Sequence, residues 1–350
     1  MQPIHSLHDF FVRSGAEVWL YHLGRRVEPC ALETLAAFEA GEMPWPEPWQ
    51  NEARLGLVFR LGDVRDPLIW FLALPLDEQG QLVAAPRDGF VQRLLETLGR
   101  SVSAVGREDR NEVGNLMQDN PLAFTPSLPF RAVMHARANR DMGQAASEHL
   151  EPVEAYLSGQ QAVDWRALGL QGLADFAVRH DATQARDLAA RLANLPEDVL
   201  TPLCYCLEHV VIDDALALAL RERGEQAAAS GDIETFCACV RAIGGADRKI
   251  AGAWFDDLLD DPNACGPDLL AAIAGRGWPH LEHAERLPRF LARLAERHDT
   301  DFMSVARDLA VIPRLRLPLL MTLREAAPDT AIGRRLAGLG TARNQALDKH

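Results

Sequence analysis

Long apolar runs are missing from this sequence of 350 residues. No stretch approaches the ~18 uncharged apolar residues that a membrane span requires, and the first ten residues, MQPIHSLHDF, lack the basic start and apolar core of a signal peptide. We therefore expect a cytoplasmic protein that does not engage a membrane. Cysteines are also few, six in all, and several lie in apolar helical patterns, which favours reduced core thiols over disulfides.

Positive charge is scarce as well. The chain has 36 Lys and Arg against 50 Asp and Glu, a formal charge of -14, and neither half is basic. Nucleic-acid affinity comes mostly from clustered cations, so we expect no nucleic-acid partner; a clamp around nucleic acid would need a stripe of arginines. The sequence lacks a GxGxxG after a strand and a GxxxxGK(S/T), which bind nucleotides, the GxSxG of serine hydrolases and the HExxH of zinc proteases. We therefore expect no cofactor, and nothing in the sequence names a reaction.

The first hundred residues alternate between the helical period and the strand period. This pattern predicts an α+β domain over residues 1–100, with a small antiparallel sheet and helices packed on it. Its expected elements are helices at 6–14, 31–40 and from Pro86 to Gly99, and strands at 17–23, 55–61 and 68–74. Residues 101–146, with few apolar residues over 101–114 and three prolines over 120–130, predict a linker wrapped over the surface, containing a helix at 131–140.

Beyond residue 147 the pattern is helical only, and it repeats. Apolar anchors recur at a nearly constant interval, at Leu170, Leu203, Phe236, Leu270 and Met303. A second helix follows each anchor, near Leu188, Leu220, Phe255, Phe290 and Leu323. Pro288 and Pro318 suit the first position of such helices. Since one pair exposes an apolar face that its neighbour must cover, the pattern predicts an all-α, HEAT-like α-solenoid over residues 147–346, with a terminal pair at 328–346.

Four strings in the first part of the chain resemble an uncharacterised bacterial family of unknown function, number 3549. They are YHLGRRVEP from Tyr21, WFLALPLDEQG from Trp70, NPLAFTPS from Asn120 and RAVMHA from Arg131. In the family pattern an acidic residue is usual where this chain has His22. The resemblance implies no activity. It implies that the first domain and the repeats belong together as one protein.

Two CxC pairs raise the question of a metal site. Cys204 and Cys237 are separated by one interval of the repeat and so occupy one position of it, where later units carry Ala271 and Ser304. The shared position favours a packing role, in which cysteine acts as a small inward-facing side chain. A metal site is disfavoured, because residues i and i+2 of a helix point apart and cannot bind one ion together. The Glu-His dipeptides at 148–149 and 208–209, and the histidines at 280 and 283, do not follow the repeat. We expect these histidines on the surface and predict no metal site.

Further candidates lie in loops and helix ends. Arg25 and Arg26 follow the first strand and are candidate anion ligands, with His22 beside them. The segment from Pro44 to Trp49, PWPEPW, offers Trp45 and Trp49 either as an exposed docking segment or as a cover over the sheet edge. The acidic run of Asp256, Asp257, Asp260 and Asp261 predicts a solvated helix end, because the spacing of a calcium loop is lacking.

The leading hypothesis is a non-enzymatic cytoplasmic adaptor or scaffold that binds a protein partner through the helical-repeat surface, because stacked helical pairs mainly bind other chains. It rests on analogy at the level of the fold. The alternative is an enzyme or small-ligand-binding protein with a site in an inter-domain cleft near residues 20–26. The sequence leaves the oligomeric state open.

Overall fold

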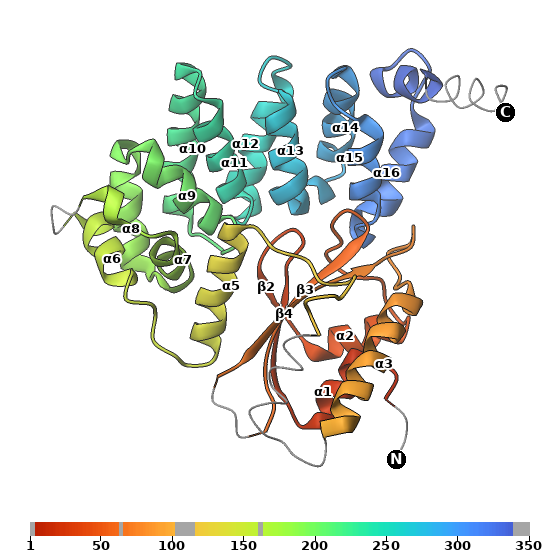
Figure 1. The fold of residues 1–350 in the computed structure, drawn as a ribbon. Helices are drawn as coiled ribbons and strands as arrows, with labels where there is room; N and C mark the ends of the chain where they lie inside the picture. The colour runs from red at the N-terminus through yellow and green to blue at the C-terminus, as the bar shows by residue number, and fades with distance from the viewer. Residues whose placement is uncertain (1–3, 63–65, 102–115, 160–163, 339–350) are drawn as a thin grey trace. The chain divides into compact units, whose positions relative to one another are not determined.

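A computed structural model of the chain describes residues 4–62, 66–101, 116–159 and 164–338 (Figure 1). The chain divides into two compact units, Met1–Ala145 and Ala146–His350, which we call the N-terminal and C-terminal units. Among the described residues, no helix has both the length and the apolar character needed to cross a bilayer.

A four-stranded antiparallel sheet forms the centre of the N-terminal unit. Its strands are β1 (Glu17–His22), β2 (Glu28–Cys30), β3 (Glu52–Arg60) and β4 (Leu68–Pro75), in the order β2-β1-β3-β4. Leu57 of β3 lies opposite Leu20 of β1 and Trp70 of β4, so the alternating apolar residues share one face. The predicted small antiparallel sheet is confirmed, whereas β2 was missed because so short a strand is unable to show a period.

Three helices accompany the strands: α1 (Leu7–Ser14), α2 (Leu32–Glu39) and α3 (Ala84–Ser101). The hydroxyl of Ser6 caps α1 by accepting a hydrogen bond from the Asp9 backbone N–H, and Gly15 ends the helix in the left-handed conformation. The core on this face consists of edge-to-face aromatic rings, with Phe59 4.6 Å from Trp70 and Trp70 5.6 Å from Phe90 of α3. Such contacts add to the free energy gained by burying the rings.

The opposite face of the sheet packs against α5 (Leu128–Asp141), which confirms the helix predicted at 131–140. Gly56 of β3 allows this approach, since a Cβ there would lie 2.5 Å from the sulfur of Met134. The Tyr21 hydroxyl donates a hydrogen bond to the Asp141 carboxylate at 2.8 Å. Residues 102–115 of the predicted linker lie outside the described residues.

The described part of the C-terminal unit is helical. Its helices are α6 (Leu150–Ser158), α7 (Leu170–Arg179), α8 (Ala182–Arg191), α9 (Glu197–Leu207), α10 (Asp214–Ser230), α11 (Ile233–Ile243), α12 (Arg248–Asp260), α13 (Pro267–Arg276), α14 (Arg286–Glu296), α15 (Phe302–Ala310) and α16 (Pro313–Glu325), with short 3-10 turns at Trp165–Ala167, Leu192–Asn194 and Trp278–Glu282. The five predicted anchors lie on α7, α9, α11, α13 and α15. Their partner positions lie on α8, α10, α12, α14 and α16.

The helices of the C-terminal unit contact their neighbours in two alternating series (Figure 1). Helix α9 contacts α7 and α11, and α11 contacts α13; likewise α10 contacts α8 and α12, and α14 contacts α12 and α16. Aspartates cap many of these helices by accepting a backbone N–H of the first turn: Asp181, Asp213, Asp232, Asp247 and Asp301. Part of the acidic composition therefore serves to start helices.

The placement of two prolines differs from the prediction. Pro288 is the third residue of α14, where its missing N–H has no intrahelical acceptor in any case. Pro318 lies inside α16, whose first residue is Pro313. A proline inside a helix costs roughly 3 kcal/mol. Tertiary packing offsets this cost, because Leu315 and Leu319 on either side of Pro318 are buried.

The repeat position shared by the first cysteine of each CxC pair is not uniformly inward. Cys204 is fully buried, Cys237 is half-buried, and Ala271 and Ser304 are exposed. The expectation of a small inward side chain in every unit is therefore wrong. The second cysteines, Cys206 and Cys239, are both buried. Of the predicted terminal pair, residues 331–338 are helical, and residues 339–346 lie outside the described part of the chain.

Candidate interaction surface

Two of the sequence-predicted binding residues, His22 and Trp45, lie side by side in the core of the N-terminal unit. The His22 ring is 4.8 Å from that of Trp45, which in turn lies 5.0 Å from the ring of Phe38 on α2. Trp45 is fully buried and His22 is 8% exposed. The segment Pro44–Trp49 therefore does not present Trp45 to a partner.

The other three candidates, Arg25, Arg26 and Trp49, surround the turn after β1. Arg25 is fully buried, its Nε donates to the Pro48 carbonyl at 2.8 Å, and its guanidinium lies 5.1 Å from the centre of the Trp49 ring. Gly24 permits this packing, because a Cβ there would lie 2.9 Å from the Cβ of Trp49. Arg26 pairs with Glu28 at 3.6 Å. The structure thus packs His22 against Trp45 and Arg25 against a half-buried Trp49, and it pairs Arg26 with Glu28.

The buried His22 makes the N-terminal unit sensitive to acid. Burial lowers the pKa of His22 from 6.5 to about 4. The unfolded chain therefore binds a proton at His22 that the folded chain does not, and we expect the free energy of unfolding to fall as the pH drops from 6.5 to 4, by up to about 1.4 kcal/mol per pH unit from this group.

Urea unfolding of the wild type and of His22→Gln over this pH range measures the effect. Both proteins share every other titrating group, so the slope should be smaller in the variant. Equal slopes in the two proteins would show that His22 does not contribute.

A group of deeply buried charges in the C-terminal unit meets at Glu208, which follows the last residue of α9. Its carboxylate is 1% exposed and receives hydrogen bonds from Nε of Arg241 at 2.6 Å and from Nε of Arg276 at 2.6 Å. Burial alone would raise the pKa of Glu208, but the charges of Arg276, His209 and Arg241 outweigh it and lower the pKa to about 2. Glu208, Arg241 and Arg276 join the carboxyl ends of α9, α11 and α13.

This cluster was not predicted. Glu208 and His209 are each 1% exposed, and His280 is 3% exposed with its Nε2 3.1 Å from the Gly244 carbonyl. The expected surface position of these two histidines is therefore wrong. A signal was available, because Glu208 and Arg241 are separated by one interval of the repeat and thus occupy equivalent positions. Opposite charges at equivalent positions of stacked helices are neighbours in space.

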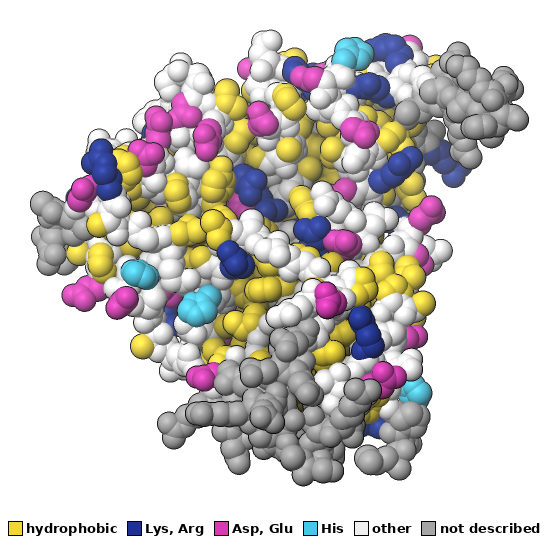
Figure 2. Space-filling model, viewed as in Figure 1, with side chains coloured by type: hydrophobic (Ala, Val, Ile, Leu, Met, Phe, Trp, Pro, Cys, Tyr) yellow, Lys and Arg dark blue, Asp and Glu magenta, His cyan; other side chains and the backbone are white. Residues whose placement is uncertain are grey.

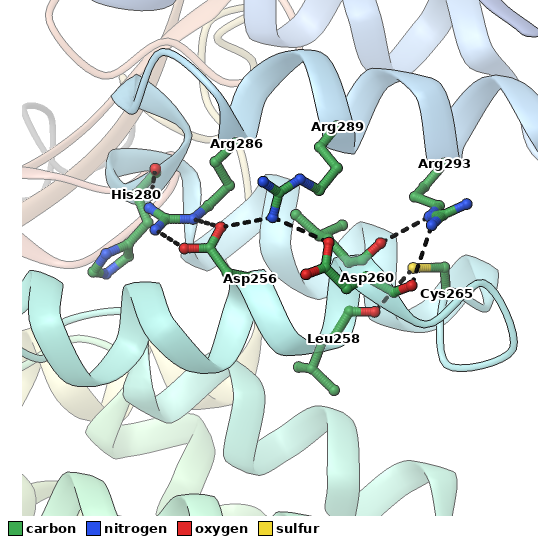
Figure 3. A network of polar contacts seen from close by, with 9 residues as sticks. Asp256, Leu258, Asp260, Cys265, His280, Arg286, Arg289 and Arg293 are labelled. Atoms are coloured by element: carbon green, nitrogen blue, oxygen red, sulfur yellow. Dashed lines mark hydrogen bonds and ion pairs between the residues drawn. The ribbon is translucent and has the colours of Figure 1, made fainter.

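A second polar network joins α12 to α14 (Figure 3). Asp256 accepts hydrogen bonds from Nε and Nη2 of Arg286 at 2.9 and 2.6 Å, and Arg289 lies between Asp256 at 3.4 Å and Asp260 at 3.1 Å. The hydrogen bonds from Arg286 lower the pKa of Asp256. Arg293, one turn further on, donates to the carbonyl of Leu259 at 2.8 Å.

The acidic run is therefore more than a solvated helix end. Asp256 and Asp260 bind the arginines of α14, and Asp257 pairs with Arg221 of α10 at 3.0 Å. The expectation of a solvated end is confirmed for Asp257 and Asp260, whose side chains are 63% and 68% exposed, whereas Asp256, at 34%, is partly buried against Arg286. The sequence has carboxylates on α12 and arginines on α14. This pattern predicts ion pairs only when the two helices are known to be adjacent.

Asp256 and Asp257 provide a matched pair of substitutions. Asp256→Asn removes the carboxylate that holds Arg286, a side chain only 7% exposed, and we expect a loss of about 1–3 kcal/mol in the free energy of unfolding. Asp257→Asn touches a carboxylate that is 63% exposed, and we expect a loss below about 0.5 kcal/mol.

Thermal unfolding followed by circular dichroism compares these two variants directly. Equal destabilisation by both substitutions would contradict the assigned role of Asp256.

The described residues line several cavities. One of about 590 Å³ lies in the C-terminal unit beside Phe302 and Arg335, one of about 410 Å³ is lined by acidic residues including Glu154 and Asp187, and one of about 170 Å³ lies between the sheet and α5 beside Ile69. None of these three is lined by the five candidate residues near β1. Within the described ranges, no three His, Cys, Asp or Glu side chains are grouped so as to hold a metal ion.

Helix α16 carries large apolar side chains on its exposed face. Leu317 is 66% exposed, Leu320 46% and Met321 48%, whereas Leu315 and Leu319 on the opposite side are buried. The three exposed residues are spaced i, i+3 and i+4 and so form one stripe, which we call the α16 stripe. A contiguous apolar patch of this kind is a recognised sign of an interaction site.

Charge is distributed unevenly along the C-terminal unit. Residues 146–285 carry 24 Asp and Glu against 10 Lys and Arg, whereas residues 286–338 carry 10 Arg against 6 Asp and Glu. Figure 2 shows acidic side chains gathered over α10 and arginines gathered over α14 to α16. The α16 stripe therefore lies in a basic part of an acidic chain.

The sequence of the chain matches the model of a known protein family. The family described as "Protein of unknown function (DUF3549)" has a model that matches residues 2–339. The chain belongs to the DUF3549 family. The match confirms the resemblance seen in the strings before residue 140, and a single DUF3549 sequence includes both units. No curated protein and no solved structure matches the chain.

Proposed function

We propose that this DUF3549 protein is a non-enzymatic cytoplasmic adaptor whose C-terminal unit is a HEAT-like α-solenoid that binds a protein partner. The observation that carries the proposal is the α16 stripe. Leu317, Leu320 and Met321 remain exposed on a helix whose other side is packed through Leu315 and Leu319, and burying such a stripe against a partner is favourable by about 25 cal/mol per Å² of apolar surface.

The contacts between alternate helices support the solenoid. In a stack of helical pairs each pair covers the apolar face of the one before, and the stack ends where the last face is covered by something else. Helix α16 belongs to the last complete pair among the described residues, α15 and α16. The ion pairs at Glu208 and Asp256 link helices of successive pairs, α9 to α11 and α13, and α12 to α14.

Affinity capture of the intact protein from the cytosol of its own cells, followed by reconstitution with the purified partner, tests the proposal. We expect one protein to be retained with simple stoichiometry, to remain after nuclease treatment, and to bind the purified protein in calorimetry. If no protein is retained above an empty-bead control, or if retention depends on nucleic acid, the adaptor function is wrong.

A further inference from the structure

We propose that the α16 stripe binds an acidic amphipathic helix of the partner. This inference rests on the proposed function and specifies the chemistry of the partner. Leu317, Leu320 and Met321 offer the apolar contact, and one helix recognises another through anchors spaced i, i+3 and i+4.

The arginines around the stripe favour a partner with negative charge. Arg314, Arg316 and Arg324 lie on α16, whose only acidic residue is Glu325. The side chain of Arg314 is 72% exposed, and its contact with Glu282 is long, at 3.5 Å. Arg324 is also exposed. A partner helix with carboxylates beside its apolar face would meet these arginines, and such complementarity raises the association rate and fixes the orientation.

A second copy of the chain is a poorer occupant. A symmetric dimer through α16 would place the same arginines opposite one another, which is unfavourable. A contact between α16 of one copy and the acidic residues 146–285 of another would not be symmetric and would continue into open chains of molecules. Sedimentation of the protein alone therefore distinguishes a partner helix from self-association.

Other exposed apolar residues of the C-terminal unit provide the control. Leu218 on α10 is 48% exposed, the same as Met321, but its surroundings are acidic, with Asp214 and Glu222 one turn away on either side. Val211 and Ile233 lie elsewhere, in a loop and at the start of α11. The Leu218→Ser variant thus removes an apolar side chain as exposed as Met321 and leaves the α16 stripe intact.

The test measures fluorescence anisotropy of a labelled, designed helical peptide with leucines on one face and glutamates on the other, titrated with the full chain. We expect binding that weakens with salt. The double variant Leu320→Ser/Met321→Ser should weaken it about tenfold or more, Arg324→Glu should also weaken it at low salt, and Leu218→Ser should leave it unchanged. Circular dichroism of each variant confirms that the fold is kept.

Several results would overturn the inference. They are absence of binding by the wild type, equal binding of a peptide with lysines in place of the glutamates, equal binding by the stripe variant, displacement of the peptide by a DNA duplex or by anionic vesicles, and self-association of the protein through the stripe. If the captured partner is still retained by the stripe variant, this inference fails while the adaptor function stands. If no partner is captured at all, the adaptor function fails.

Discussion

Replacing Glu208 with alanine is expected to lower the free energy of unfolding of the C-terminal unit by about 3–5 kcal/mol, because it leaves Arg276 buried without its carboxylate. The Arg276 side chain is 7% exposed and Glu208 is 1% exposed, so water cannot replace the lost contacts. Glu208→Gln keeps the shape of the side chain but not its charge, and we expect most of the loss to remain.

Hydrogen exchange measured by mass spectrometry locates this effect. Faster exchange is expected in α9, α11 and α13, the three helices that the cluster joins. Glu225→Ala on α10 is the control, since this carboxylate is 50% exposed and its ion pair with Arg221 contributes little. Equal effects of the two alanine substitutions would contradict the role of the buried cluster.

The Glu208 carboxylate also predicts that the C-terminal unit loses stability in acid. Because the pKa of Glu208 falls from 4.5 to about 2 on folding, its contribution to stability is complete above pH 4.5 and is lost as the pH falls toward 2. In Glu208→Gln this part of the pH dependence should be absent.

Replacing Glu39 with alanine is expected to destabilise the N-terminal unit by about 3 kcal/mol. The carboxylate at the end of α2 accepts the backbone N–H groups of Leu7 and His8, both at 2.9 Å, and pairs with Arg87 of α3 at 2.7 Å. Its side chain is 2% exposed. A negative charge at the start of α1 also interacts favourably with the helix dipole, so one residue stabilises three helices.

Asp88→Ala provides the comparison for Glu39→Ala. Asp88 also binds Arg87, at 2.7 Å, but its side chain is 57% exposed. We expect a loss of under about 1 kcal/mol for this variant. Urea unfolding followed by hydrogen exchange in α1 and α3 measures both. The role assigned to Glu39 would be disproved by a stable Glu39→Ala protein with unchanged exchange in α1.

Local pattern was sufficient to predict most of the fold. Alternation over Leu55–Leu61 predicted β3, an almost wholly apolar run over Leu68–Leu74 predicted β4, and the regular spacing of anchors placed the paired helices. Pro318 shows the limit of local rules. The cost of a proline inside α16 is offset by packing of Leu315 and Leu319, which depends on neighbours that are distant in the sequence.

The site residues were harder to predict, because burial and pairing decide their role. His22, Arg25 and Trp45 are of residue types common in binding sites, yet all three are buried in the N-terminal unit. Glu39 receives its partners from Leu7, His8 and Arg87, which are distant in the sequence. Periodicity did not predict the α16 stripe, because α16 has apolar residues on two sides. Only the packing of neighbouring helices shows which side is buried and which is exposed.

A hydrogen-exchange footprint of the full chain with the purified captured protein tests the proposed binding role of the helical repeats most directly. We predict slower exchange in peptides covering residues 313–325 and in the adjoining α14, with no change around residues 20–49. Protection confined to the N-terminal unit near His22 and Trp49, with the peptides of α14 and α16 unchanged, would contradict the claim that the helical repeats bind the partner.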